Sequence, residues 1–154
     1  MNQTVFATVV TGLVIFVLGQ ILLKLFIEPM QEMRKTIGLV AHALKGRAAV
    51  IHNPTVSNTD ELKEVSRYLR DFSAKLYSHL YAVPFYRVAS RLFLLPTKKC
   101  VLTAVRELGG LSNNLTSQNP SIHQVNAGHV QRISESLGLF MPENERWPDE
   151  PRHN

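Results

Sequence analysis

Cysteine is almost absent from this chain, and the common catalytic motifs are absent altogether. Cys100 is the one cysteine among 154 residues, which excludes an intramolecular disulfide framework and a zinc site built from several cysteines. The 6 histidines include no H-x-x-x-H pair, so we expect no metal site. The sequence has no nucleophile elbow, P-loop or dinucleotide-binding glycine motif. We therefore expect a protein that is not an enzyme and that binds no cofactor.

The first part of the chain also lacks charge. Lys24 is the one charged residue between Thr4 and Phe26, and most of the other residues there are apolar. About 20 apolar residues, at 1.5 Å each, span the roughly 30 Å hydrocarbon layer of a bilayer. A cleaved signal peptide would need a positively charged start and a small-residue cleavage site after the apolar run, and neither is present. We therefore predict a transmembrane helix over residues 4–27.

Positive charge lies after this helix and not before it. No lysine or arginine precedes the helix, and the cationic residues that follow its apolar part are Lys24, Arg34, Lys35, Lys45 and Arg47. The positive-inside rule then places the N-terminus outside and the rest of the chain in the cytoplasm. The sequence therefore predicts a single-pass protein of the bacterial inner membrane, and a reduced Cys100 is compatible with that compartment.

One side of the expected membrane helix carries small and hydroxyl residues. At about 100° per residue, one sector of the helix contains Thr4, Thr8, Thr11, Gly12, Ile15 and Gly19. The opposite side, which includes Val10 and Val17, suits contact with lipid. Small residues let transmembrane helices pack closely, so this Thr/Gly face predicts helix packing or the lining of a narrow pore. The alternative is chance, because glycine and threonine are common in such helices.

A second apolar stripe follows over residues 28–46. Its residues are spaced three and four apart, as in the seam of a coiled coil: Met30, Met33, Ile37, Val40 and Leu44. If the helix is uninterrupted, this stripe shares a sector with the Thr/Gly face, so we expect one helix over 4–46 and one continuous face for self-association. Pro29 would kink the helix and rotate the stripe. The alternative is that the stripe packs against the rest of the same chain.

Residues 57–140 predict a small helical bundle, because no stretch of useful length shows the alternation of a β-strand. Asn53 and Pro54 indicate a loop over 46–57. The helices expected after the loop cover about 58–81, 84–95, 98–115 and 121–138. Residues 141–154 are rich in proline and polar side chains and predict a flexible tail. The expected fold class is all-α: a transmembrane helix that continues into a cytosolic helix, then this bundle.

Particular residues mark the ends of these helices. Capping signals stand at the expected starts: Ser57 with Asp60 or Asn58 with Glu61, then Pro84, Thr97, and Ser121 with Gln124. Gly138 suits a left-handed cap after the last helix. The apolar residues of that last helix are Ile122, Val125, Val130, Ile133 and Leu137. Gly109 and Gly110 lie inside a helix, where each costs about 1 kcal/mol, and they indicate a close helix approach or a kink.

Basic and aromatic residues are concentrated in the middle of the chain. The net charge is +5, and no acidic residue occurs between Asp71 and Glu107. The basic patch in this interval consists of Arg87, Arg91, Lys98 and Lys99, with aromatic residues interleaved. Three interpretations are open: contact with anionic lipid of the inner leaflet, binding of nucleic acid or a nucleotide, or a solvated face around core aromatics. Lipid is favoured over nucleic acid, because the membrane helix already holds the patch near the bilayer.

Arg47 and His52 match the arginine–histidine spacing of a family of helical ribonucleases. A chain with this many arginines and histidines is expected to contain such a match by chance, and Arg146 with His153 is a second one. The pair therefore does not change the expectation that the protein is not an enzyme.

Two segments carry a resemblance to known proteins: LRDFSAKLYSHLYAVPFYRVASRLFLLP (Leu69–Pro96) and AVRELGGLSNNL (Ala104–Leu115). They resemble segments of small, uncharacterised single-pass bacterial membrane proteins with a cytosolic helical bundle. More distantly, the order of parts is similar to that of the membrane-pore accessory protein of RNA-targeting CRISPR systems. That resemblance implies a ring of several copies that depolarises membranes in antiviral defence.

These observations favour an oligomeric inner-membrane protein that forms a ring-shaped pore, gated by its cytosolic domain and lined by Thr4, Thr8, Thr11 and Gly12. A passive membrane-anchored adaptor that recruits a cytosolic protein partner is the first alternative. A membrane module that senses a nucleotide or a nucleic acid is the second.

Overall fold

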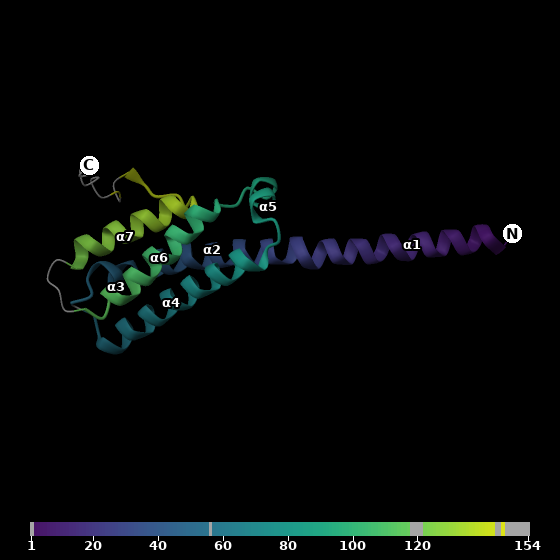
Figure 1. Ribbon diagram of the computed structural model, residues 1–154. Helices are drawn as coiled ribbons and strands as arrows, with labels where there is room; N and C mark the ends of the chain where they lie inside the picture. Colours follow the sequence, from purple (N-terminus) through teal and green to yellow (C-terminus); the bar gives the residue numbers. More distant parts are fainter. Residues whose placement is uncertain (1, 56, 118–121, 144–145, 147–154) are drawn as a thin grey trace.

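A long N-terminal helix projects from one end of a bundle of shorter helices (Figure 1). The computed structural model describes residues 2–55, 57–117, 122–143 and 146, and none of these forms a strand. In chain order the helices are α1 (Asn2–Leu22), η1 (Leu23–Ile27), α2 (Glu28–Gly46), α3 (Ala48–His52), α4 (Thr59–Ala82), α5 (Tyr86–Leu92), α6 (Lys98–Asn114) and α7 (Ile122–Leu137). The all-α class, with an apolar helix first and a bundle second, is confirmed.

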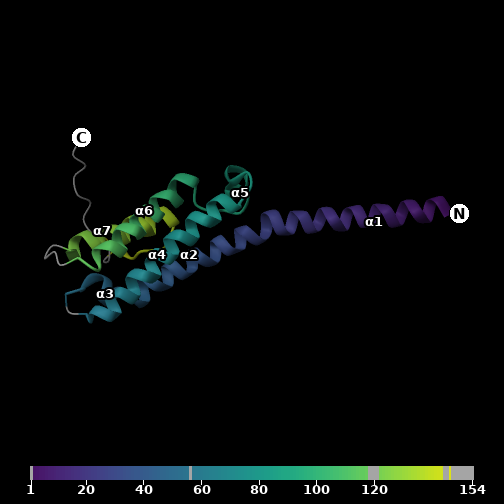
Figure 2. The ribbon, with the colours of Figure 1, turned by 60° about the horizontal axis from the view of Figure 1, so that its bottom comes forward.

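α1 and α2 form one continuous helix, joined by the single π-helical turn η1. In that turn the N–H of Glu28 donates to the carbonyl of Leu23, five residues back instead of four. Pro29 accounts for the wider turn, because it has no N–H to donate and its ring crowds the carbonyl four residues before it. An extra residue in the turn relieves this crowding without ending the helix. Figure 2 shows a clear bend between the two parts, as expected beside Pro29.

The π turn changes which residues of α1 and α2 share a side. A π turn holds one residue more than an α turn, so it rotates everything after it by about 100° relative to an uninterrupted α-helix. The apolar stripe of α2 and the Thr/Gly face of α1 therefore lie on different sectors. The expectation of one helix over 4–46 is confirmed, but that of one continuous contact face is wrong.

The apolar stripe of α2 packs inside its own chain. Of its residues, Met30, Met33, Val40 and Leu44 are buried and Ile37 packs beside them. α2 lies along α4, and the hydroxyl of Tyr86 lies 3.3 Å from Sδ of Met33. The prediction that this stripe joins copies of the chain is therefore corrected, because other helices of the same chain already cover these side chains.

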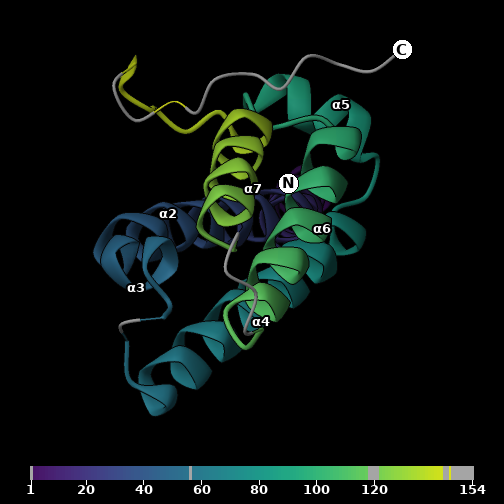
Figure 3. The same cartoon turned by 90° about the vertical axis from the view of Figure 1, so that its left-hand side faces the viewer.

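α2, α4, α6 and α7 lie side by side to form the bundle (Figures 1 and 3). α4 packs against both α2 and α6, and α7 packs against α6 but meets α2 over a much smaller area. Serine hydroxyls tie α4 to α6: Ser66 donates to the carbonyl of Ser112 at 2.8 Å, and Ser73 to that of Val105 at 2.9 Å. The bundle is therefore least closed between α2 and α7.

The expected helix ends are largely confirmed. Asn58, and not Ser57, is the N-cap of α4, since its side chain accepts a hydrogen bond from the N–H of Asp60. Thr97 caps α6, and Gly138 follows α7 with a φ of 68°. Ser121 of the predicted capping box and most of the predicted tail over 141–154 lie outside the described residues.

Helix α3 and the first turn of α7 differ from expectation. The predicted loop over 46–57 contains α3, because Val50 and Ile51 are buried and residues 48–52 include no glycine or proline. Val125 of α7 is 46% exposed, whereas its neighbour Asn126 is buried. The Asn126 side chain donates to the Ile51 carbonyl at 2.8 Å. Since that carbonyl belongs to α3, a helix the sequence did not predict decides which side of α7 faces inward. The predicted helix over 84–95 is also shorter, being α5 alone.

Met33→Ala tests whether the stripe of α2 is internal. Met33 is fully buried, while Leu39 on the same helix is 41% exposed. We expect Met33→Ala to lower the free energy of unfolding by about 2–5 kcal/mol, because it leaves a cavity, and the control Leu39→Ala to lower it by less than about 1 kcal/mol. Circular dichroism during chemical denaturation in detergent measures both. If Met33→Ala instead left the stability unchanged and reduced the size of the assembly, the stripe would have to lie at an interface between copies.

Candidate functional site

No other described part of the chain covers α1. Its side chains from Gln3 to Leu22 are exposed on every side, and the helix Gln3–Gly46 is the one in the described part of the chain that is long and apolar enough to cross a membrane. The 21 residues of α1 give a length of about 30 Å, close to the thickness of the hydrocarbon layer. A helix that is apolar all round is stable in lipid or in a protein core, and the chain supplies no core here. One candidate membrane span therefore precedes the bundle.

The Thr/Gly face of α1 is open. Its residues, all exposed, are Thr4, Thr8, Thr11, Gly12, Ile15 and Gly19. No atom lies within 4 Å of the place that a Cβ would take at Gly12 or Gly19. The Thr8 hydroxyl donates to the Thr4 carbonyl at 2.9 Å, so its donor is satisfied within the helix. The face can therefore meet apolar surroundings or a second helix at short range.

The basic patch lies at the end of the bundle from which α1 leaves (Figure 1). Arg87 and Arg91 belong to α5, and Lys98 and Lys99 belong to the first turn of α6. All four are exposed. The ammonium of Lys98 lies 5.1 Å from the ring centre of Tyr81. The fold thus gathers these residues beside an exposed aromatic ring, at the end of the bundle next to the candidate membrane span.

Two polar contacts fix α5 to the bundle. The buried Tyr86 hydroxyl donates to the Pro96 carbonyl at 2.7 Å, and burial raises the pKa of Tyr86 to about 12, so it stays a neutral donor. Arg34 of α2 donates to the carbonyl of Phe93, directly after α5. Ala89 and Ser90 complete the buried side of this short helix. α5 is therefore held firmly, although its outer side is uncovered.

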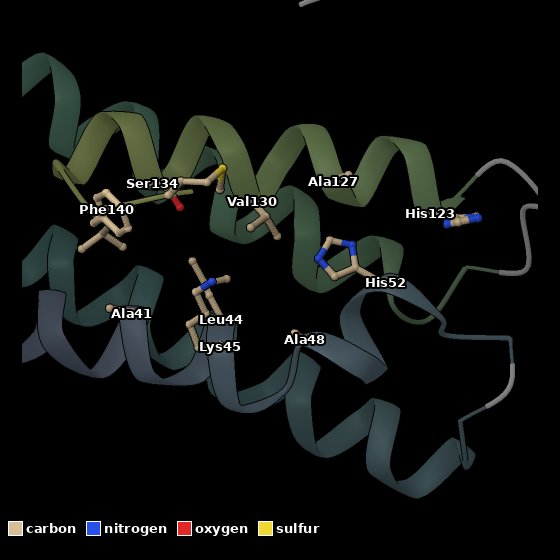
Figure 4. A pocket seen from close by; sticks show the side chains of 12 residues that line it. Ala41, Leu44, Lys45, Ala48, His52, His123, Ala127, Val130, Ser134 and Phe140 are labelled. Atoms are coloured by element: carbon tan, nitrogen blue, oxygen red, sulfur yellow. The ribbon is translucent and has the colours of Figure 1, made fainter. Parts of the chain in front are cut away.

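A groove of about 580 Å³ runs between α7 and the pair α2–α3, where the bundle is least closed (Figure 4). Apolar side chains of both walls, among them Leu44, Val130 and Phe140, line most of it. Lys45 and His52 extend between the walls, and His123 lies at one end (Figure 4). No sequence pattern predicts this groove, because its shape depends on how α7 packs against α2 and α3.

A buried carboxylate joins α6 to α7. Oε2 of Glu107 lies 2.7 Å from both Nδ1 of His129 and Nε of Arg132, and Arg106 lies 3.1 Å from Oε1. Burial alone raises the pKa of the Glu107 carboxyl, but the hydrogen bonds from Arg132 and His129 outweigh it and bring the pKa below its ordinary value. The cluster therefore favours a charged Glu107 and pairs it fully. The sequence pattern does not reveal this cluster, although His129 and Arg132, three residues apart, share a face of α7.

The residues of the ribonuclease-like spacing have separate partners. Arg47 forms ion pairs with Glu61 at 3.7 Å and Glu64 at 3.6 Å on α4, while His52 lines the groove. Cys100 is half-buried, with its sulfur 3.1 Å from the Thr97 hydroxyl. Among the described residues, no cluster of histidine, cysteine or acidic side chains could hold a metal ion.

Comparisons with protein-family models, curated proteins and solved structures find no match for this chain. The candidate sites therefore rest on the geometry of the chain itself: the uncovered α1, the basic patch and the groove.

Gly110 and Gly109 provide a matched pair of tests. A Cβ at Gly110 would lie 2.8 Å from Cε1 of His129, whereas at Gly109 nothing lies within 4 Å. The expected close approach therefore involves Gly110 alone. We expect Gly110→Ala to push His129 away from Glu107 and destabilise the bundle, and Gly109→Ala to stabilise it by about 1 kcal/mol through helix propensity. Chemical denaturation compares them, and equal effects would contradict the contact.

Glu107→Gln tests the charged cluster through its pH dependence. Because the folded-state pKa of Glu107 lies below the ordinary 4.5, its contribution is complete above pH 4.5 and is lost as pH falls through the lower, folded-state pKa. At neutral pH we expect Glu107→Gln to cost about 1–3 kcal/mol. Below pH 4.5 its stability should fall less than that of the unmodified protein. The exposed Glu135→Gln is the control, and parallel acid profiles for Glu107→Gln and the unmodified protein would refute the assignment.

Proposed function

We propose that this chain is a non-enzymatic single-pass protein of the bacterial inner membrane, with α1 across the bilayer and the bundle in the cytoplasm. The observation that carries this proposal is the apolar surface of α1, which is exposed along its whole length. The cationic residues after α1 support an outside N-terminus. The gathering of Arg87, Arg91, Lys98 and Lys99 at the near end of the bundle supports the same orientation, since the cytoplasmic leaflet is anionic.

The same helix supports self-association in the membrane. The stripe of α2 is used within the chain, so an assembly would be held by α1 through its Thr/Gly face. Gly12 and Gly19 leave room for a neighbouring helix, and threonine beside glycine is typical of close transmembrane packing. Several such faces around one axis would form a narrow, weakly polar channel lined by Thr4, Thr8, Thr11 and Gly12.

The join between α1 and α2 supports a gated assembly over a passive anchor. The helix from Gln3 to Gly46 is unbroken, and Met30, Met33 and Val40 of its second half are part of the bundle core. A tilt or rotation of α1 in the membrane is therefore carried directly into the packing of α2 against α4. A protein that only tethered its bundle would have no need of such a rigid connection.

A membrane-anchored adaptor is the second candidate, and the groove between α2 and α7 favours it. Its apolar lining and its volume of about 580 Å³ suit a cluster of side chains from a cytosolic partner. In that case α1 would serve as an anchor alone, and a different transmembrane helix could replace it without loss of function.

Gly12→Leu tests the assembly through α1. We expect the unmodified protein to have the mass of several chains in detergent, and Gly12→Leu to lower this mass towards one chain, because a large side chain separates the Thr/Gly faces. Val17→Leu, on the opposite side of α1, is the matched control and should leave the mass unchanged. Light scattering with detergent subtraction measures the mass, and ion flux from proteoliposomes reports the channel.

The outcomes separate the two candidates. Loss of both mass and flux in Gly12→Leu, with neither changed in Val17→Leu, supports the pore. A protein that has the mass of one chain at every concentration eliminates it and leaves the adaptor. Assembly without flux retains self-association and rejects the channel.

A further inference from the structure

The outer side of α5 carries an apolar cluster at the end of the bundle nearest α1 (Figure 1). Phe85, Val88, Leu92 and Leu94, together the α5 tip, are 78%, 68%, 76% and 87% exposed. A hollow of about 370 Å³ with only apolar lining residues lies between α5 and the segment Leu22–Ile27. The α5 tip therefore lies at the level where the chain leaves the proposed membrane span.

The backbone holds two of these large side chains in an unusual conformation. Phe85 and Leu94 have φ values of 49° and 51°, in the left-handed region. Bulky residues seldom adopt this conformation, which glycine and asparagine adopt readily. A surface that faced only water would favour small polar residues at both positions. Large apolar residues there indicate that the tip meets an apolar environment.

The charges around the α5 tip select the kind of environment. Arg87 and Arg91 alternate with its apolar residues, and no acidic residue occurs between Asp71 and Glu107. Glu28, in the first turn of α2, is an acidic residue close to this level along the helix. Apolar side chains flanked by cationic ones characterise helices that lie in the interface of anionic bilayers. The exposed rings of Tyr77 and Tyr81, on the last turns of α4, are also of the type enriched at that depth.

We propose that the α5 tip inserts into the interface of the anionic leaflet that α1 crosses. This inference rests on the proposal that α1 spans the membrane, which holds the tip at the headgroup level without further cost. Tyr86 and Arg34 fix α5 to the bundle, so insertion of the tip orients the whole bundle. The chain then has two attachments, α1 through the bilayer and the α5 tip at its surface.

Quenching of tryptophan by brominated lipid measures this insertion in the full-length protein. The one native tryptophan, Trp147, is replaced by phenylalanine, and Val88→Trp or Leu92→Trp places a probe in the tip. Phe16→Trp reports on α1. Val125→Trp is the matched control, because Val125 is exposed in the first turn of α7, and α7 begins at the end of the bundle far from α1 (Figure 1). The vesicles contain phosphatidylglycerol and a phosphatidylcholine brominated either near the headgroup or in the middle of its acyl chains.

We expect bromine near the headgroup to remove roughly half of the emission of the tip probes and to leave Val125→Trp unchanged, as for a side chain at the acyl boundary. Combined Arg87→Glu and Arg91→Glu should reduce quenching at the tip in these vesicles. Quenching of Phe16→Trp by mid-chain bromine with unquenched tip probes would overturn the inference while α1 still spans. A second copy that covers the tip would give this same pattern. An unquenched Phe16→Trp would refute the membrane span, and this inference would fail with it.

Discussion

One unbroken helix is uncovered over its first half and enclosed by protein over its second, and the arrangement of the other helices follows from this constraint. Its first half, α1, is apolar on every side and exposed along its length. Its second half, α2, is polar except for one stripe, and that stripe needs covering by protein. α4 supplies most of the cover, and α6 and α7 build outward from α4. Because no flexible linker separates the halves, the orientation of the bundle is fixed relative to α1.

The turn η1, just before Pro29, sets the rotation of α2 about the helix axis relative to α1. If the Thr/Gly face and the α2 stripe shared a sector, a second α1 on that face would approach from the side that α4 occupies. The extra residue of the π turn rotates the stripe by about 100° and removes this conflict. The π turn that Pro29 requires would therefore let α1 associate with another copy while α2 stays covered by α4. This separation of the two faces supports the proposed assembly through α1.

The sequence predicted the features that depend on local pattern. The uncharged run after Thr4, the caps at Asn58 and Thr97, and the left-handed Gly138 were all visible without a structure. The features it did not predict depend on contacts between distant segments. Burial of Asn126 in place of Val125 requires the Ile51 carbonyl, and the pairing of Glu107 requires α7 beside α6. The open face of α5 had a sequence signal, since the segment 84–95 holds more large apolar residues than one buried side needs, interleaved with Arg87 and Arg91.

The two long sides of α7 are held by different interactions. Towards α6, Glu107 pairs with His129 and Arg132. Moving α7 away would leave the buried Glu107 carboxylate without these partners, which is costly. Towards α2 and α3, the Asn126 bond to Ile51 fixes one end and the rest of the interface opens into the groove. Any molecule in the groove would touch α7 and the second half of α2 together. Since α2 continues into α1 without a break, such a contact would reach α1 through the backbone of one helix.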